Sequence, residues 1–264
     1  MQSIPFVDKQ WNVFNKRERI LWFYQNIYPF FMGLNLGENH YVVTQAKWIK
    51  DKFSIKFNFP LERIFPIRPI VNISLNEEKQ KFNMGEYNVF LPSSPFVYKN
   101  NTEIANALIY LKSINQDISK FKIFVTFENK DDVDLHNVIK SNNLENNFLF
   151  IGRLTCTEML KYYNGCDLVI FPSYIETFGL PLLEAAAFGK PLVCANESYA
   201  KEVIGNYSGA TLLDINSPNK WGESILKNFK TRKKYNKYTA DFKESWGDFF
   251  KLIKDIINTN LKNV

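Results

Sequence analysis

Residues 171–185 read FPSYIETFGLPLLEA, and this stretch decides how the chain folds. The run leaves an apolar strand, passes through a tight turn and enters a helix at Pro181, where a missing N–H is tolerated. Gly179 lets the backbone approach a ligand closely, and the free N–H groups at the start of a helix attract an anion such as a diphosphate. The stretch therefore predicts a phosphate-binding turn between a strand and a helix.

Two carboxylates flank this turn: Glu176 precedes it, and Glu184 lies in the second turn of the helix. A carboxylate offers two acceptor oxygens, which match the paired hydroxyls of a sugar such as ribose. The alternative for Glu184 is a carboxylate that compensates the helix dipole and stabilises by about 0.3–1 kcal/mol. For Glu176 the alternative is a solvated loop residue. The pair and the turn together predict a site for the sugars on either side of a diphosphate.

From about Tyr87 onward, short apolar strands alternate with helical stretches. The strands are rich in Phe, Ile, Val and Leu without strict alternation, which is typical of a sheet buried on both faces. This order predicts an α/β fold with a doubly wound parallel sheet, which binds ligands at the carboxyl ends of its strands. The expected strands are 88–91, 122–127, 147–151, 168–171, 191–195 and 211–213. The expected helices are 102–114, 133–141, 157–164, 181–188, 199–204 and 220–229.

Several helices carry start signals. Thr155 and Glu158 have the spacing of a capping box, and Asp131 or Asp132 is expected to cap the helix 133–141. The D-x-D of residues 132–134 has the form of a metal-binding motif, but here a cap and a solvated charge explain it. No His, Cys or carboxylate cluster has metal-ligand spacing, so no metal is expected.

Composition limits the class of protein. With 264 residues, 45% hydrophobic and 23% charged, the chain is an ordinary globular protein, and its net charge of +6 is spread along it. No nucleic-acid-binding motif, apolar run of membrane-spanning length or basic start before an apolar run is present. Cys156, Cys166 and Cys194 are expected to be buried free thiols in a reducing cytosol. These features predict a cytoplasmic protein without a nucleic-acid partner.

The first 72 residues differ from the rest. A mostly helical aromatic stretch (11–31), a strand (41–44), a helix (46–57) and a strand (63–67) are too few for a complete doubly wound domain. We therefore expect a partial N-terminal domain at 1–72, a polar linker at 73–86 and a ligand-binding domain at 87–239. Residues 240–264 are expected to form a helix that packs back toward the N-terminal part through one apolar face.

The chain resembles the family-4 retaining glycosyltransferases of the GT-B fold. The likeness rests on Pro172-Ser173, on Glu176-x7-Glu184 and on Gly179–Pro181, and it extends over residues 87–229. Residues 150–154 with 158–163 resemble the base-binding stretch of the family, and residues 166–173 and 185–193 match the segments around the signature. A lone Glu-x7-Glu is weak, but this ordered set over about 140 residues is specific.

The resemblance implies roles for individual residues. Glu184 would bind ribose hydroxyls, and Glu176 would be catalytic by holding the transferred sugar. Lys99 would be the second catalytic residue, because a fixed cation stabilises the charge of a leaving diphosphate; the alternative is an exposed surface lysine. Ser93 stands where the family has an arginine, and Arg153 is a candidate second cation. The implied donor-binding residues are Gly152, Arg153, Leu154, Met159, Ser173, Thr177, Phe178, Gly179, Leu180 and Glu184.

The function implied is transfer of a sugar from a nucleoside diphosphate sugar, UDP- or GDP-linked, with retention and without a metal or other cofactor. Bacterial surface polysaccharide assembly is the implied setting, with a lipid-linked or saccharide acceptor. The aromatic stretch 22–31 would then contact the inner face of the plasma membrane; core packing is the alternative. The competing functions are a nucleotide-sugar-binding fragment without its own turnover and a sugar-nucleotide epimerase, which the run 179–185 disfavours.

The short first domain has three explanations. Residues 2–6 resemble a stretch deep inside the first domain of the family, and residues 41–67 resemble its last strands and helix. A sheet without its leading strands exposes backbone edges and apolar faces. A truncated or split gene product, a partner chain that completes the domain, and self-association all remain open.

Overall fold

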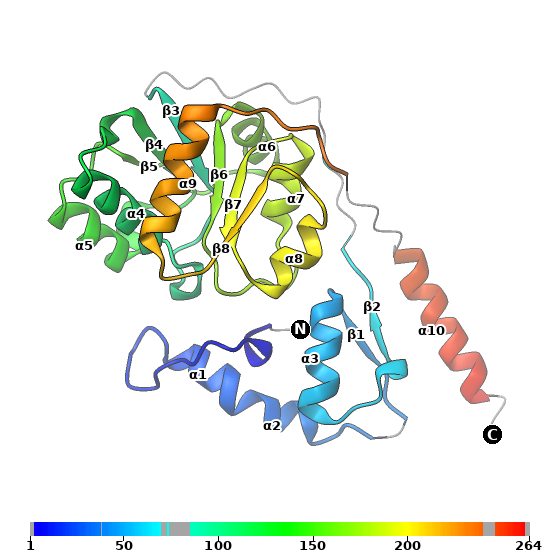
Figure 1. Ribbon diagram of the computed structural model, residues 1–264. Coiled ribbons are helices and arrows are strands. Elements are labelled where there is room, and N and C mark those ends of the chain that lie inside the picture. Colours follow the sequence, from blue (N-terminus) through cyan, green and yellow to red (C-terminus); the bar gives the residue numbers. More distant parts are fainter. Residues whose placement is uncertain (1–2, 38, 70–72, 74–84, 240–245, 262–264) are drawn as a thin grey trace. The chain divides into compact units, whose positions relative to one another are not determined.

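The computed structural model describes residues 3–37, 39–69, 73, 85–239 and 246–261 (Figure 1). Over these residues the chain divides into two compact units. The first comprises Met1–Asn72, Glu176–Phe178 and Asp241–Val264, and the second comprises Ile73–Ile175 and Gly179–Ala240. The predicted linker 73–86 lies mostly outside the described residues, as do residues 240–245 of the predicted last helix.

The second unit is built on a six-stranded parallel sheet with the strand order β5-β4-β3-β6-β7-β8. The order reverses between β3 and β6, so a switch point lies at the middle of the sheet. The predicted doubly wound α/β fold is therefore confirmed. The strands are β3 (Tyr87–Leu91), β4 (Phe121–Val125), β5 (Phe148–Phe150), β6 (Leu168–Phe171), β7 (Leu192–Ala195) and β8 (Ala210–Leu213).

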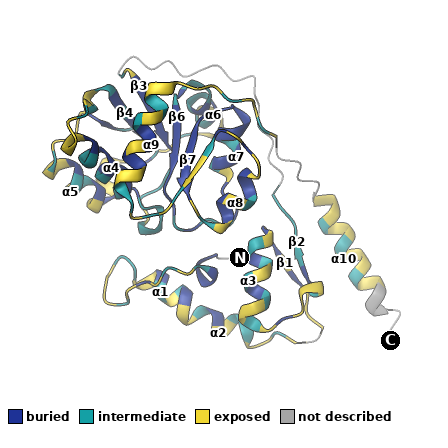
Figure 2. Cartoon of the chain, viewed as in Figure 1, coloured by how far each residue is buried: buried dark blue, intermediate teal, exposed yellow. Residues whose placement is uncertain are grey.

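Helices cover both faces of this sheet (Figure 1). On β3, Tyr87, Val89 and Leu91 belong to the core beneath α4 and α9. The ring of Phe90 points to the other face, where its centre lies 5.0 Å from that of Tyr163 in α6. Buried residues therefore alternate between two cores, which is why the strand sequences are apolar throughout (Figure 2). The helices are α4 (Thr102–Ser113), α5 (Val133–Ser141), α6 (Cys156–Gly165), α7 (Leu180–Ala187), α8 (Ser198–Ile204) and α9 (Pro218–Thr231), with the 3-10 turns η3 (Val97–Lys99), η4 (Ile118–Lys120) and η5 (Asn129–Asp131).

Side-chain caps start two of these helices as predicted. The Thr155 hydroxyl accepts from the Glu158 N–H at 3.3 Å, while the Glu158 carboxylate accepts from the Thr155 N–H at 2.7 Å. Asp132, rather than Asp131, caps α5 by accepting from the Leu135 N–H at 3.2 Å. The first carboxylate of the D-x-D sequence therefore has a structural task.

Replacing Thr155 with alanine should lower the free energy of unfolding by about 1 kcal/mol, because the N–H of Glu158 loses its acceptor. Chemical denaturation measures this change. The matched control is Thr157→Ala in the exposed first turn of the same helix, which should change stability by less than about 0.5 kcal/mol. Equal losses in both variants would contradict a role for the cap.

The first unit has fewer regular elements. Its two strands pair in parallel, with Val42 opposite Ile64. Its elements are η1 (Ile4–Phe6), α1 (Arg19–Asn26), α2 (Tyr28–Gly33), β1 (Val42–Thr44), α3 (Lys47–Phe57), η2 (Leu61–Arg63), β2 (Ile64–Pro66) and α10 (Trp246–Leu261). The apolar side chains of α10 include exposed Trp246 and Phe250 (Figure 2), and its packing toward the N-terminal part stays a prediction.

The stretch 11–31, predicted to be mostly helical, contains two helices, α1 and α2. Before α1, polar side chains hold turns: Asn12 accepts from the Phe14 N–H at 2.9 Å and Asn15 from the Arg17 N–H at 3.0 Å. Such local bonds compete with helix formation. Pro29 then lies at the start of α2, where it cannot donate the next bond of a continuing helix. Side-chain turns and a proline therefore limit the extent of the two helices.

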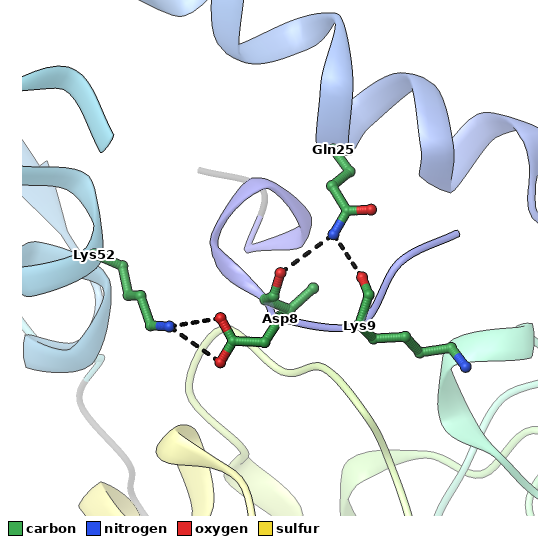
Figure 3. A network of polar contacts seen from close by, with 5 residues as sticks. Asp8, Lys9, Gln25 and Lys52 are labelled. Carbon is green, nitrogen blue, oxygen red and sulfur yellow. Dashed lines mark hydrogen bonds and ion pairs between the residues drawn. The ribbon is translucent and has the colours of Figure 1, made fainter. Parts of the chain in front are cut away.

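Polar contacts hold the N-terminal segment of this unit in place (Figure 3). The buried amide of Gln25 donates to the carbonyl oxygens of Val7 and Lys9. The Lys52 ammonium on α3 bonds the Asp8 carboxylate at 2.8 Å. The segment before α1 is therefore fixed to both α1 and α3.

The prediction of three buried cysteines is only partly correct. Cys166 and Cys194 are buried, and burial raises the pKa of each thiol to about 12. Cys156, the first residue of α6, is exposed. All three are free thiols. None of the helices in the described part of the chain has the length and apolar character needed to cross a membrane.

Candidate functional site

A pocket of about 600 Å³ lies in the second unit, beside the carboxyl ends of β3, β4 and β5. This is the end of a parallel sheet where ligands are expected. Of the predicted donor-binding residues, Arg153, Leu154 and Met159 line it together. The full lining consists of Ser93, Ser94, Pro95, Phe96, Thr126, Phe127, Glu128, Asp131, Arg153, Leu154 and Met159.

The lining combines groups suited to different parts of a nucleotide. Leu154 and Met159 offer apolar surface for a flat ring, while Arg153 supplies a guanidinium for an anion. Glu128 and Asp131 supply carboxylate acceptors. Gly152, beside this wall, has a left-handed backbone with φ +71, and a Cβ there would stand 2.9 Å from Glu128 Oε1. The pocket is therefore amphipathic, with a small charged rim.

A hydrogen-bond network fixes the loop that follows β3. The Ser93 N–H donates to the Thr126 hydroxyl at 2.8 Å, and that hydroxyl donates back to the Ser93 carbonyl at 2.7 Å. Buried Asn101 donates to the Ser94 carbonyl at 2.9 Å and to Asp132 at 3.0 Å. Ser93, which stands where an arginine was expected, therefore ties the loop to β4 rather than supplying a charge.

Lys99 ends the 3-10 turn η3 on the same loop. Its ammonium lies 5.2 Å from the ring centre of Phe171, the last residue of β6, and 5.7 Å from that of Tyr98. These are cation–π distances, and the side chain is half-buried. Lys99 therefore lies at the switch point between β3 and β6, and its catalytic role stays a prediction.

Ser173 joins this loop to the end of β6. Its buried hydroxyl lies 3.3 Å from the Tyr98 carbonyl and 2.9 Å from the Ile175 carbonyl, both acceptors. The Tyr174 N–H donates to the same Tyr98 carbonyl at 2.8 Å, and the Tyr199 hydroxyl donates to the Ser173 carbonyl at 2.8 Å. Ser173 thus positions the Lys99 loop, and its contact with a donor stays a prediction.

The helix α7 begins as the sequence predicts, with Pro181 in its first turn. Gly179 is its N-cap and has φ +90, a left-handed conformation that glycine adopts without a Cβ penalty. A Cβ there would also lie 3.0 Å from the ring of Tyr199. The glycine is therefore required locally. Pro181 has no N–H and the Leu182 N–H donates to the Gly179 carbonyl at 3.0 Å, so the first turn presents the N–H of Leu180.

Glu184 lies in the middle of α7 and is partly buried. Burial raises the pKa of its carboxyl, and the nearby Tyr163 hydroxyl partly opposes that shift. A carboxylate that compensates a helix dipole needs no such environment. Its burial is a cost that a functional residue is expected to carry.

The remaining signature residues group differently. Glu176, Thr177 and Phe178 belong to the first unit, where the Trp48 indole donates to the Thr177 carbonyl at 3.2 Å. Lys99, Ser173 and Glu184 are outside the set that lines the pocket. The second unit therefore brings together Arg153, Leu154 and Met159 at the pocket, and Lys99 with Ser173 at the switch point.

Sequence reasoning assigned no ligand contact to seven of the residues that line the pocket: Ser94, Pro95, Phe96, Thr126, Phe127, Glu128 and Asp131. Three of them, Thr126, Phe127 and Glu128, directly follow β4, and a strand end is a signal that was available. Asp131 was treated only as a cap, and Phe96 only as part of a loop. Their shared position beside one sheet edge became visible only once the strand order was known.

Two comparisons of sequence point to one family. A family model described as "Glycosyl transferases group 1" matches residues 76–244, more than half of the chain. O-antigen chain mannosyltransferase RfbU of Salmonella typhimurium is 24% identical over 227 residues, which cover 83% of this chain and 61% of RfbU. D-inositol 3-phosphate glycosyltransferase of Paenarthrobacter aurescens is 28% identical over 119 residues, which cover 44% of this chain and 29% of that protein. The chain thus spans less than two thirds of the length of either relative.

Solved structures agree on the fold. WaaG, a glycosyltransferase involved in lipopolysaccharide biosynthesis, matches with a TM-score of 0.61 and 17% identity over 83% of this chain and 60% of WaaG. HepE of Anabaena, solved in complex with UDP and glucose, matches with a TM-score of 0.59 and 20% identity over 72% of this chain and 54% of HepE. The predicted GT-B-type fold is therefore confirmed.

Proposed function

We propose that this chain, which belongs to the glycosyl transferases group 1 family, binds a nucleoside diphosphate sugar and transfers its sugar to an acceptor. The donor is a UDP- or GDP-linked hexose, and the reaction retains configuration and uses no metal or other cofactor. Within the family, the chain is assigned to family 4. Its setting is bacterial surface polysaccharide synthesis, with a saccharide or lipid-linked acceptor on the cytoplasmic side.

One observation carries this proposal: an amphipathic pocket at the carboxyl ends of β3–β5 lies in the unit that also carries Lys99 and the glycine-led start of α7. Apolar walls suit a base, while helix N–H groups and a cation suit a diphosphate. Glu184 would accept the ribose hydroxyls, and Glu176 would hold the transferred sugar. Lys99 would stabilise the leaving phosphate.

Calorimetric titration of the full chain with UDP, GDP, ADP and the matching hexose donors tests binding. We expect at least one diphosphate to bind with a Kd in the micromolar to millimolar range that enzymes typically show for substrates. Release of nucleotide from the donor, with and without saccharide acceptors, then tests turnover. Failure of every nucleotide to bind would contradict the proposal.

A second candidate is a nucleotide-sugar-binding subunit without its own turnover. Its support is that the matched relatives extend well beyond the region they share with this chain. A partner chain or a second copy of this chain would then complete the acceptor side. Tight nucleotide binding without donor cleavage, restored on adding the completing chain, would select this candidate.

Membrane contact is the proposed role of the aromatic side chains around α2. Phe30 and Phe31 are 65% and 57% exposed, and the cationic Lys16, Arg17 and Arg19 precede them in the sequence. Exposed aromatics with nearby cations suit an anionic lipid surface.

Vesicles with about one third anionic lipid should co-sediment the chain, and neutral vesicles should do so several-fold less. The double variant Phe30→Ser/Phe31→Ser should lose most of this binding. Concentration-dependent self-association without vesicle binding, abolished by the same variant, would assign the aromatic surface to a second copy instead.

A further inference from the structure

We infer that the Glu128 carboxylate selects a guanine base, so that the site takes a guanosine rather than a uridine diphosphate sugar. This inference rests on the proposed function and goes beyond it by naming the base. Two residues separate the end of β4 from Glu128, which lies at the sheet edge beside the pocket. It shares the pocket lining with Arg153, Leu154 and Met159.

The turn that carries Glu128 is held by its backbone. The Glu128 N–H donates to the Asp131 carboxylate at 3.2 Å, and the Asp131 N–H donates back to the Glu128 carbonyl at 2.9 Å and joins its side chain in the capping box of η5. Oε1 of the exposed Glu128 lies over Gly152, 2.9 Å from where a Cβ would stand, and glycine leaves that space open. The turn therefore places this carboxylate beside Gly152 at the wall of the pocket.

The pocket around it is asymmetric. Leu154 and Met159 provide apolar contact for the faces of a planar base, and Phe127 is buried behind the same wall. Glu128 and Asp131 provide acceptors without donors, and Arg153 is the one cationic side chain in the lining. Arg153 can pair with one of these two carboxylates. The lining as a whole still has more acceptors than donors, so it favours a base edge rich in N–H donors.

Guanine has that edge. Its ring N1–H and its exocyclic amine lie side by side and match the two oxygens of one carboxylate. Uracil places a single N–H between two carbonyl oxygens, which would repel the carboxylate, and adenine places one amine beside an acceptor nitrogen. Because the Asp131 N–H occupies only one of the four lone pairs of Glu128, both carboxylate oxygens remain available to a base.

The test is calorimetric titration of GDP, UDP and ADP into the full-length chain and three variants. For the unmodified protein we expect GDP to bind at least about tenfold more tightly than UDP or ADP, the effect of one charged hydrogen-bond pair. Glu128→Gln keeps an oxygen for the Asp131 cap but loses the paired acceptor, so the preference should fall below about threefold. Glu145→Gln, an exposed carboxylate elsewhere in the unit, should leave the preference unchanged.

Asp131→Asn tests whether the preference depends on Glu128 or on Asp131. This variant retains the carboxylate of Glu128, so it should retain the GDP preference. UDP binding as tightly as GDP in the unmodified protein would overturn the inference while leaving the proposed function intact. Equal weakening of GDP and UDP by Glu128→Gln, or loss of the preference in Asp131→Asn with Glu128→Gln unaffected, would also overturn it. Failure of all three nucleotides to bind would overturn the proposed function itself, and thermal unfolding of each variant shows whether it is folded.

Discussion

Replacing Lys99 with alanine should lower the rate of sugar transfer by about 100- to 1,000-fold while weakening nucleotide binding far less. The physical reason is the charge that develops on the leaving diphosphate, which a fixed cation stabilises more strongly in the transition state than in the bound donor. Lys99 lies at the switch point of the sheet, with its ammonium 5.2 Å from the ring centre of Phe171.

The loop around Lys99 explains why the effect should be large. The backbone before it is tied to β4 through Ser93 and Thr126, and the Tyr98 carbonyl accepts from the Tyr174 N–H at 2.8 Å. A cation on a fixed loop does not have to be reoriented when the charge appears. Lys99→Arg should therefore restore only part of the rate, because a planar guanidinium does not fit the position of a compact ammonium.

Steady-state kinetics and calorimetry on the same preparations measure the two quantities separately. Lys227→Ala, an exposed lysine on α9, is the matched control and should leave both unchanged. If Lys99→Ala keeps the full rate, or loses affinity and rate by the same factor, Lys99 does not act on the transition state. If the unmodified chain cleaves the donor only with a completing partner, the comparison is made in that complex.

The sheet of the second unit could be predicted from sequence because its signals are local and agree with one another. Each strand is a short apolar run. Capping residues such as Thr155 and Asp132 show where some of the helices begin. Strands that are buried on both faces are apolar at every position, so they can be recognised without an alternating apolar and polar pattern. The strand order was not predicted, because right-handed crossovers between parallel strands limit the possible orders without selecting one.

The site was predictable only in part. Gly179 and Glu184 carry a motif, whereas Glu128 acquires a role only through its distance from Gly152, which lies across the sheet edge and 24 residues later in the chain. Such proximity depends on strand order, which no local pattern encodes. The exact start of α1 was also out of reach, because Asn12 and Asn15 bond the backbone locally and hold turns within a stretch that is otherwise mostly helical.

Replacing Glu184 with glutamine should weaken nucleotide binding by about 10- to 100-fold and, in the same molecule, raise the stability of the unliganded protein at neutral pH. The first effect follows from the proposed contact with the ribose hydroxyls, because a hydrogen bond to a charged group contributes about 1.5–3 kcal/mol. The second follows from burial, which raises the pKa of Glu184.

The sign of the stability effect follows from proton binding. A folded-state pKa above the unfolded value means that the folded protein binds the proton more tightly. The contribution of Glu184 to the free energy of unfolding is therefore fully present below the ordinary carboxyl pKa. It is lost as the pH rises through the raised pKa of the folded state. Above both values the partly buried charge is a net cost, and glutamine removes it while keeping an oxygen near the Tyr163 hydroxyl.

Thermal unfolding across a pH series, without nucleotide, measures this effect in the unmodified protein and in Glu184→Gln. The variant should be more stable at neutral pH, and the difference should disappear below the ordinary carboxyl pKa. Glu145→Gln, whose side chain is exposed, should show neither change. A variant that is less stable at neutral pH would contradict the prediction, because the charge of Glu184 would then stabilise the folded protein.

Nucleotide affinity should follow the opposite pH course. As the pH falls through the raised pKa of Glu184, protonation removes the charged acceptor, so nucleotide binding by the unmodified protein should weaken on the acid side. Glu184→Gln should bind weakly but without this acid-side loss, because its amide does not titrate. Both effects would arise from one buried carboxylate, which lowers the stability of the free protein and strengthens its binding of a ribose. Parallel acid-side weakening in both proteins would assign the titration to another group and remove Glu184 from the ribose site.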